Sequence, residues 1–146
     1  MSAEAMRVHG ADVPLHTGGG VEVVDITGEV ERIVGESGVR QGLVVVAVPG
    51  STGAVTTIEH EPGLERDLAE ALERLVPRDA PYHHDARWGD GNGHSHVRAA
   101  LVGPSLVLPV RDGVPVHGTW QQIVFVELDN RPRERRLVVQ VVGTGR

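Results

Sequence analysis

One stretch of this chain gathers most of the side chains that could do chemistry. Residues 82–96, with the sequence YHHDARWGDGNGHSH, hold four of the eight histidines together with two aspartates and an asparagine. Glycines separate these groups, and glycine and asparagine let a backbone turn tightly. Imidazole and carboxylate groups in one cluster can bind a metal or carry protons in hydrolysis and group transfer. We therefore expect a small polar site that is built largely from this segment.

The same segment could bind a metal. Two nitrogen donors and a carboxylate suit zinc, manganese or iron, and the candidate ligands are His83, His84, His94, His96, Asp85, Asp90 and Asn92. The HExxH pattern of zinc proteases is absent from the sequence. On a helix, His94 and His96 would point about 200° apart, so at most one of them would serve the site. A solvated histidine-rich loop without a ligand is the alternative interpretation.

Four residues outside this segment are further candidates, and each also has a purely structural interpretation. Glu59 ends a predicted strand, where it could act as a base or a ligand or simply lie at the surface. Asp67 lies in the first turns of a predicted helix, where interaction with the helix dipole would also explain it. Trp120 could form the wall of a ring-binding pocket or belong to the core, and Gln121 could recognise an amide or hydroxyl group.

The composition excludes several kinds of chemistry. The chain has no cysteine, which rules out disulfides, thiolate catalysis and cysteine-bound zinc or iron–sulfur centres. All 14 basic residues are arginines, so Schiff-base catalysis by lysine is excluded and an anion must be bound by arginine or protonated histidine. A net charge of -6 argues against nucleic-acid binding. We expect the arginine-rich run at 131–136 to be a solvated turn or a subunit contact.

The hydrophobic pattern predicts an α+β fold in one domain, residues 1–146. A long helix is expected over 62–76, because it has a stripe of leucines at positions 64, 68, 72 and 75. Thr27 is expected to cap a helix over 28–37, and a short helix is expected over 95–101. An edge strand should lie within the first twenty residues, and further strands are predicted over 21–27, 42–48, 51–59, 105–110, 120–128 and 136–142.

Two further expectations come from the same pass along the chain. Asp112 and Gly113 stand between two apolar runs and indicate a β-hairpin. No apolar run approaches the roughly 20 residues that a membrane-spanning helix needs, so a cytoplasmic protein without a membrane partner is expected.

Several motifs together resemble those of a known family. The block SLVLPV at 105–110, followed by Gly113 and by GTWQQI at 118–123, is similar to the signature of the YjbQ family, often labelled secondary thiamine-phosphate synthase. The supporting matches are TTIE at 56–59, Asp67, Tyr82-His83-His84, Asn92, Ser95-His96, Gly103 and the RPRERR run at 131–136. The resemblance covers nearly the whole chain from about Val21 onward.

The resemblance implies a mostly antiparallel, β-sandwich-like core with one long and one short helix, which assembles as a homotrimer. It also implies transfer of a hydroxymethylpyrimidine group from its diphosphate to a thiazole phosphate, so a small phosphorylated molecule is the expected ligand. A polar pocket near subunit boundaries would contain His84, His96 and Asp90 as ligands of a divalent metal. This metal, zinc, manganese or magnesium, would neutralise the departing diphosphate.

Other residues would complete this pocket. Catalytic roles are expected for Glu59, Asp67, His84, Trp120 and Gln121, while Asn92 and Arg98 would hold the phosphorylated ligand. One departure is that many relatives have a His-Thr-Ser/Thr-Ala stretch where this chain has GSTG at 50–53, so an imidazole is missing at Gly50. Two alternatives stay open: a metal-dependent hydrolase with Glu59 as its base, and a non-enzymatic trimeric protein that binds a metal or a small anion.

Overall fold

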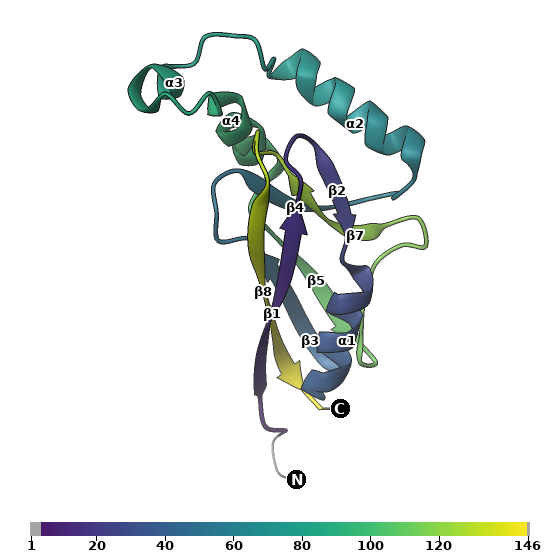
Figure 1. Ribbon diagram of the computed structural model, residues 1–146. Helices are drawn as coiled ribbons and strands as arrows, with labels where there is room; N and C mark the ends of the chain where they lie inside the picture. The colour runs from purple at the N-terminus through teal and green to yellow at the C-terminus, as the bar shows by residue number, and fades with distance from the viewer. Residues whose placement is uncertain (1–3, 146) are drawn as a thin grey trace.

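Two antiparallel β-sheets form the centre of the molecule (Figure 1). The computed structural model describes residues 4–145. Its larger sheet consists of five strands in the order β1 (Arg7–Thr17), β8 (Arg133–Thr144), β3 (Gln41–Ala47), β5 (Ser105–Arg111) and β6 (Val114–Pro115). Its smaller sheet consists of three strands in the order β2 (Glu22–Asp25), β7 (Gln122–Glu127) and β4 (Gly53–Ile58). The helices of the described residues are α1 (Thr27–Ser37), α2 (Pro62–Leu75), α3 (His83–Trp88) and α4 (Gly93–Val102).

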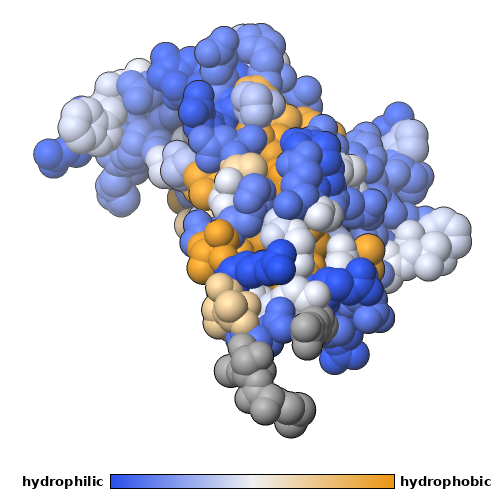
Figure 2. Space-filling model, turned by 90° about the horizontal axis from the view of Figure 1, so that it is seen from below, coloured by the Kyte–Doolittle hydropathy of each residue, from blue (hydrophilic) through white to orange (hydrophobic). Residues whose placement is uncertain are grey.

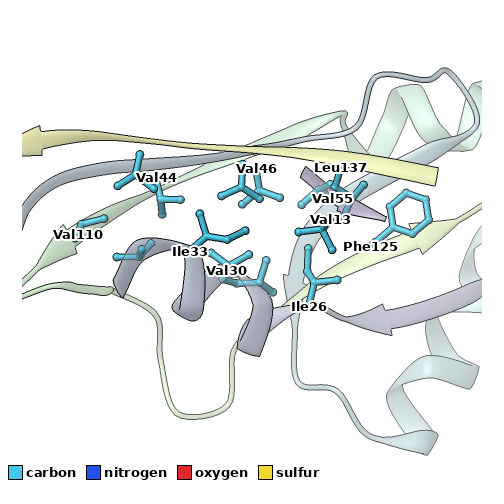
Figure 3. Close-up of a cluster of buried hydrophobic side chains, with 14 of the residues drawn as sticks. Val13, Ile26, Val30, Ile33, Val44, Val46, Val55, Val110, Phe125 and Leu137 are labelled. Carbon is cyan, nitrogen blue, oxygen red and sulfur yellow. The ribbon is translucent and has the colours of Figure 1, made fainter. Parts of the chain in front are cut away.

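The larger core lies between the five-stranded sheet, α1 and one face of the three-stranded sheet. Strands β3 and β8 alternate buried and more exposed residues, so each turns one row of aliphatic side chains inward. Val46 of β3 lies over Ile33 of α1 in this layer, and Phe125 of β7 closes the end of the same cluster near Leu137 (Figure 3). Complete burial of such side chains stabilises the fold by about 1.5–3 kcal/mol each. The predicted α+β fold with a sandwich-like core is therefore confirmed.

A smaller core lies on the other face of the three-stranded sheet. Val124 and Val126 of β7 point to this side because they alternate with Phe125, and Leu72 of α2 and Ala99 of α4 pack against them. Helix α4 also contacts β4 directly. This layer fixes α4, and with it two of the histidines, against the sheet.

Most of the predicted elements are present, with shifts of a few residues at their ends. Strand β1 forms an edge of its sheet, as expected. The predicted hairpin connects β5 to β6, and positive φ angles of 52° at Asp112 and 81° at Gly113 form its turn. Residues 82–96, expected as a loop before a short helix, instead contain α3 and the start of α4.

Two local predictions are wrong. Thr27 does not cap α1: the N-cap is Ile26, which has no side-chain capping bond, and the Thr27 hydroxyl accepts a hydrogen bond from the Ile123 N–H at 2.9 Å instead. This bond ties the start of α1 to β7. Leu75, expected on the buried stripe of α2, is 74% exposed, whereas Leu72 in the same last turn is buried.

The outer face of the five-stranded sheet carries exposed aliphatic side chains. Leu43 is 46% exposed, Val107 is 54% exposed and Val138 is 37% exposed. Strand register places them on neighbouring strands, since Ala47 pairs with Val138 and Val45 pairs with Val107. At the end of the molecule where β1 starts and β8 ends, hydrophobic residues also emerge between mostly polar ones (Figure 2). None of the helices within residues 4–145 combines the length and the apolar character needed to cross a bilayer.

Candidate functional site

Helices α3 and α4 bring His84 and His96 together. Their ring centroids lie 4.3 Å apart with an interplanar angle of 39°. The chain reverses between the two helices at Gly89 and Gly91, whose positive φ angles of 71° and 66° suit glycine. The Asp85 carboxylate then accepts a hydrogen bond from the Gly93 N–H at 2.8 Å, which joins the first turn of α3 to the first turn of α4.

The two imidazoles line a cavity of about 390 Å³, which we call the histidine pocket. Side chains from the α3–α4 segment form one side of it, and residues from β8 and from the segment before β4 form the other. The lining residues are Ser51, Thr52, His84, Trp88, Asp90, Asn92, His96, Arg133 and Arg135.

A completely buried carboxylate, Glu127, anchors one of the two arginines. Its Oε1 accepts hydrogen bonds from the Thr17 hydroxyl at 2.6 Å and from Arg135 Nε at 2.8 Å, and its Oε2 accepts one from Arg135 Nη2 at 2.6 Å. Burial alone would raise the pKa of Glu127, but the hydrogen bonds from Arg135 and Thr17 outweigh it and lower the pKa. Glu127 is therefore ionised at neutral pH and holds Arg135 in place.

Asp129, also completely buried, anchors the second arginine. Its Oδ2 accepts hydrogen bonds from Arg133 Nε at 2.7 Å and from the Thr52 hydroxyl at 3.0 Å. Its Oδ1 accepts hydrogen bonds from the Asn130 N–H at 2.8 Å and from the Asn92 amide at 3.3 Å. Burial opposes ionisation, yet these bonds together lower the pKa of Asp129 from 3.8 to about 2.

Each arginine uses only one edge of its guanidinium group for these anchors. Arg133 and Arg135 bond through Nε and Nη2, and no hydrogen bond to a described residue engages Nη1 of either. A Cβ atom placed on Gly50 would lie 3.2 Å from Nη1 of Arg135. Glycine at this position therefore leaves space directly beside an unused guanidinium N–H group.

His96 differs from a solvated histidine in its protonation. Burial lowers the pKa of His96, and the positive charge of His84 lowers it further. His96 is therefore mainly neutral at pH 7. His84 Nδ1 is buried without a hydrogen-bond partner among the described residues, and it lies 3.5 Å from a carboxylate oxygen of Asp85. The Asp85 carboxylate thus lies beside this ring nitrogen at more than the usual hydrogen-bond distance.

Comparison with known proteins decides which family this chain belongs to. The model of the family described as "UPF0047 protein YjbQ-like" matches residues 11–144. The chain belongs to the YjbQ family. A UPF0047 protein of Methanothermobacter thermautotrophicus is 44% identical over 138 residues, which is 94% of each chain. The family that the motifs resemble is therefore confirmed.

Solved structures of YjbQ relatives share the fold. A YbjQ-like protein of unknown function from Sulfolobus solfataricus P2 superposes with a TM-score of 0.91 at 37% identity, over 95% of this chain and 99% of that one. A hypothetical protein of Aeropyrum pernix K1 superposes with a TM-score of 0.85 at 36% identity, over 92% of this chain and 98% of that one. These relatives support the family and the architecture, and their names state no activity.

The structure brings only part of the predicted YjbQ site into the histidine pocket. Asp90 and Asn92 line it with His84 and His96. Glu59 follows the last residue of β4 and Gln121 precedes the first residue of β7, so both lie at the end of the three-stranded sheet that is away from the pocket. At that end Ile58 pairs with Gln122, whereas Gly53 pairs with Glu127 at the pocket end. A six-residue strand separates the two ends by about 17 Å. Their predicted roles stay predictions.

The remaining predicted residues also lie outside this pocket. Trp120 is 73% exposed, and Asp67 is exposed on α2. Gln121 donates a hydrogen bond to the Thr57 hydroxyl at 3.0 Å, so its amide is held beside β4. Arg98 is buried on another side of α4, where its Nη2 binds Glu73 at 2.6 Å. Arg98 therefore lines a different cavity, and its predicted contact with a ligand of the histidine pocket stays a prediction.

The sequence interpretation missed the acidic and arginine residues that shape the pocket. The run at 131–136 is not simply a solvated turn, since Arg133 and Arg135 are in strand β8 and the Arg135 side chain is only 10% exposed. The available signal was alternation: Arg133 and Arg135 are two residues apart at the start of a strand and so share one face. Glu127 and Asp129 show the same spacing after an apolar run.

The pocket supplies fewer metal ligands than the sequence suggested. Within residues 4–145, no three histidine, aspartate or glutamate side chains gather closely enough to hold a metal ion. His84 and His96 offer two imidazoles, whereas catalytic zinc sites have three protein ligands. A divalent metal in the YjbQ pocket therefore stays a prediction.

Proposed function

We propose that the histidine pocket binds a small phosphorylated molecule, and that the protein is a transferase of the thiamine-phosphate synthase type. One observation carries the proposal. The Nη1 groups of Arg133 and Arg135 are unused beside the paired rings of His84 and His96. Four groups that can donate hydrogen bonds thus line one cavity, and no hydrogen bond among the described residues joins them to the carboxylate of Asp90 in the same lining.

Hydrogen-bonding capacity, more than net charge, supports a phosphate ligand. The anchors Glu127 and Asp129 balance the charges of Arg135 and Arg133, so the cavity floor is close to neutral. The oxygens of both anchors are already engaged, whereas the guanidinium groups still have N–H donors. Each charge-assisted hydrogen bond to a phosphate oxygen contributes about 1.5–3 kcal/mol. A few such bonds are enough for binding at ordinary metabolite concentrations.

In the proposed reaction, the carbon–oxygen bond between the pyrimidine methylene group and the diphosphate breaks as the thiazole nitrogen forms a bond to that carbon. Negative charge develops on the departing diphosphate. Arg133 and Arg135 bind the diphosphate and stabilise this charge, since their anchors fix them before the ligand arrives. Neutral His96 donates or accepts a hydrogen bond at the same phosphate group, and His84 positions it through the ring contact.

The predicted metal, zinc, manganese or magnesium, would be held by His84 and His96, with Asp90 nearby in the lining. Such an ion supplies neutralisation of phosphate charge when bound. Because the two imidazoles fall short of a three-ligand site, the steps above use only the residues of the chain. Elemental analysis of the purified protein tests this part: a stoichiometric metal that is lost in the double variant His84→Ala, His96→Ala supports it.

The transferase assay separates catalysis from binding. Formation of thiamine phosphate from the pyrimidine diphosphate and the thiazole phosphate is measured for the wild type, for a His84→Gln, His96→Gln double variant and for His83→Gln. His83 lies exposed on the same helix and serves as the matched control. We expect kcat/KM to fall about 100-fold or more in the double variant, the range for loss of a hydrogen-bond donor at a developing charge, and to stay unchanged in the control.

Two results would argue against the transferase. A double variant with full activity would remove the histidine pocket from the reaction. Binding of the pyrimidine diphosphate without product would favour the non-enzymatic alternative, a protein that sequesters a small anion. The geometry of a single chain does not support a metal-dependent hydrolase with Glu59 as its base, because Glu59 lies at the end of the three-stranded sheet that is away from the histidine pocket.

We also propose that the chain forms the homotrimer that the family resemblance implies. The exposed aliphatic side chains of Leu43, Val107 and Val138 on one face of the five-stranded sheet support it, since exposed apolar surface marks an interaction site. Leu43→Asp should convert the assembly to monomers in light scattering. Leu75→Asp, which changes an equally apolar exposed residue on α2, should leave the mass unchanged. A wild type that is monomeric would refute the trimer.

A further inference from the structure

A second cavity, of about 410 Å³, lies against the face of α4 that carries His94 and Arg98, and we call it the His94 pocket. His94 and Arg98 are four residues apart and share one face of the helix, while His96 points about 200° away from His94. The His94 pocket and the histidine pocket therefore use different faces of α4. The polar residues of the His94 pocket are Glu73, Arg78, His94, Arg98, Asp129 and Asn130.

His94 is the most unusual group in this pocket. Its side chain is only 3% exposed, and its Nδ1 is buried without a hydrogen-bond partner among the described residues. Its Nε2 has one contact, with the Ser95 hydroxyl at 3.5 Å. Burial, followed by the charges of Arg98 and Arg78, lowers the pKa of His94, so the ring is neutral at pH 7. Polar atoms this deeply buried normally have a partner.

Both carboxylates of the pocket already accept hydrogen bonds from arginine or backbone donors. Glu73 accepts hydrogen bonds from the Arg78 backbone N–H at 3.1 Å and from Arg98 Nη2 at 2.6 Å, one at each oxygen. Asp129 faces Arg133 and three other donors, as described for the histidine pocket. Asp129 therefore accepts four hydrogen bonds, and Glu73 is bound at both of its oxygens.

The donors, by contrast, are in surplus. The guanidinium group of Arg98 bonds through Nε and Nη2 to the Val76 carbonyl and to Glu73, which leaves Nη1 without a partner among the described residues. No hydrogen bond to a described residue involves the Arg78 guanidinium group, since only the Arg78 backbone N–H is bonded. Two arginines, Arg78 and Arg98, share the single negative charge of Glu73, because Arg133 already balances Asp129.

We propose that the His94 pocket is a second binding site, which takes a small oxyanion such as a phosphate or carboxylate group. The anion accepts hydrogen bonds from the His94 ring, from Nη1 of Arg98 and from the Arg78 guanidinium group. A cation is the wrong ligand for this arrangement, because it would meet two guanidinium charges, and both oxygens of each carboxylate already accept hydrogen bonds. The site is independent of the reaction proposed for the histidine pocket, since it uses neither His84 nor His96.

Histidine ring signals in NMR spectra test the proposal, because they report on the two pockets separately. Inorganic phosphate and acetate are titrated in turn into the full chain, with sodium chloride at matched ionic strength as the control for screening. We expect the His94 ring signals to shift and saturate with at least one oxyanion and to stay unchanged with chloride. Which of the two oxyanions binds more tightly assigns the ligand class.

A matched pair of exposed arginines makes the test specific. Arg78→Gln removes one charge-assisted donor and should weaken binding at His94 about tenfold, while the His96 signals respond as in the wild type. Arg74→Gln, in the last turn of α2, removes an equal charge outside the pocket and should change neither. The proposal is overturned if the His94 ring ignores both oxyanions, if it responds equally to chloride, or if the two variants behave alike.

Discussion

Replacing Asp129 with asparagine removes the negative charge that anchors Arg133 beneath the histidine pocket. The pKa of Asp129 falls from 3.8 to about 2 on folding, so its ionised form stabilises the fold by about 2 kcal/mol at pH 7. Breaking a buried ion pair can cost about 3–5 kcal/mol. The smaller value of about 2 kcal/mol applies to Asp129, because the Arg133 side chain is 32% exposed and can turn towards water.

The sign of the pH dependence follows from the lowered pKa. The contribution of Asp129 is fully present above pH 3.8 and is lost as the pH falls towards about 2. Urea unfolding of wild type and Asp129→Asn should therefore show a difference of about 2 kcal/mol at pH 7 that shrinks to about 1 kcal/mol at pH 3. Asp90→Asn, which changes an exposed carboxylate of the same pocket, should stay within about 0.5 kcal/mol of the wild type.

Two results would refute this reasoning. A difference below about 0.5 kcal/mol at pH 7 would mean that the Asp129–Arg133 pair stabilises nothing beyond a surface ion pair. A difference that is as large at pH 3 as at pH 7 would show that the loss comes from packing, with no part played by the carboxylate charge.

Two further predictions concern the same site. Glu127→Gln should lower the free energy of unfolding at pH 7 by about 3 kcal/mol in urea melts, because it leaves a buried guanidinium charge uncompensated. The control Glu134→Gln changes a side chain that is 90% exposed and should leave the free energy of unfolding nearly unchanged. Equal effects of the two variants would contradict the anchor role of Glu127. His84→Ala should raise the pKa of His96 in an NMR titration, since it removes a positive neighbour. Burial should still keep the pKa of His96 below 6.5. An unaltered pKa of His96 would show that the two rings do not interact.

The hydrophobic pattern of the sequence predicted those helices and strands that bury a regular row of apolar side chains. The apolar run at 42–48 became β3, and the leucine stripe from Leu64 to Leu72 became the buried side of α2, since burial alone sets those periods. Helix α3 has only six residues and no buried side chain, so its sequence contains no hydrophobic periodicity from which a helix could be predicted. Its limits depend on Gly89 and on contacts with α4, which only the tertiary structure reveals.

The candidate site was predictable in part. His84 and His96 could be paired because a short glycine-rich segment joins them. Glu127 could not be recognised as an anchor, because a carboxylate in an apolar strand looks the same whether it is exposed or paired. Its partner, Arg135, belongs to the other sheet. Trp120 belongs to the signature block of the family, and the pocket histidines belong to its supporting motifs. Trp120 nevertheless lies outside the histidine pocket, so motifs of one family need not lie at one site in a single chain.

The pairing of β1 with β8 has a practical consequence for handling the protein. Arg7 pairs with Gly143, so the start of β1 and the end of β8 lie together at the pole opposite α3 and α4 (Figure 1). A tether attached at either end would leave the helical pole free in solution. A short linker joining the two ends, with new ends opened at the turn of Asp112 and Gly113, would give a circular permutant that separates only β6 from its partner strand.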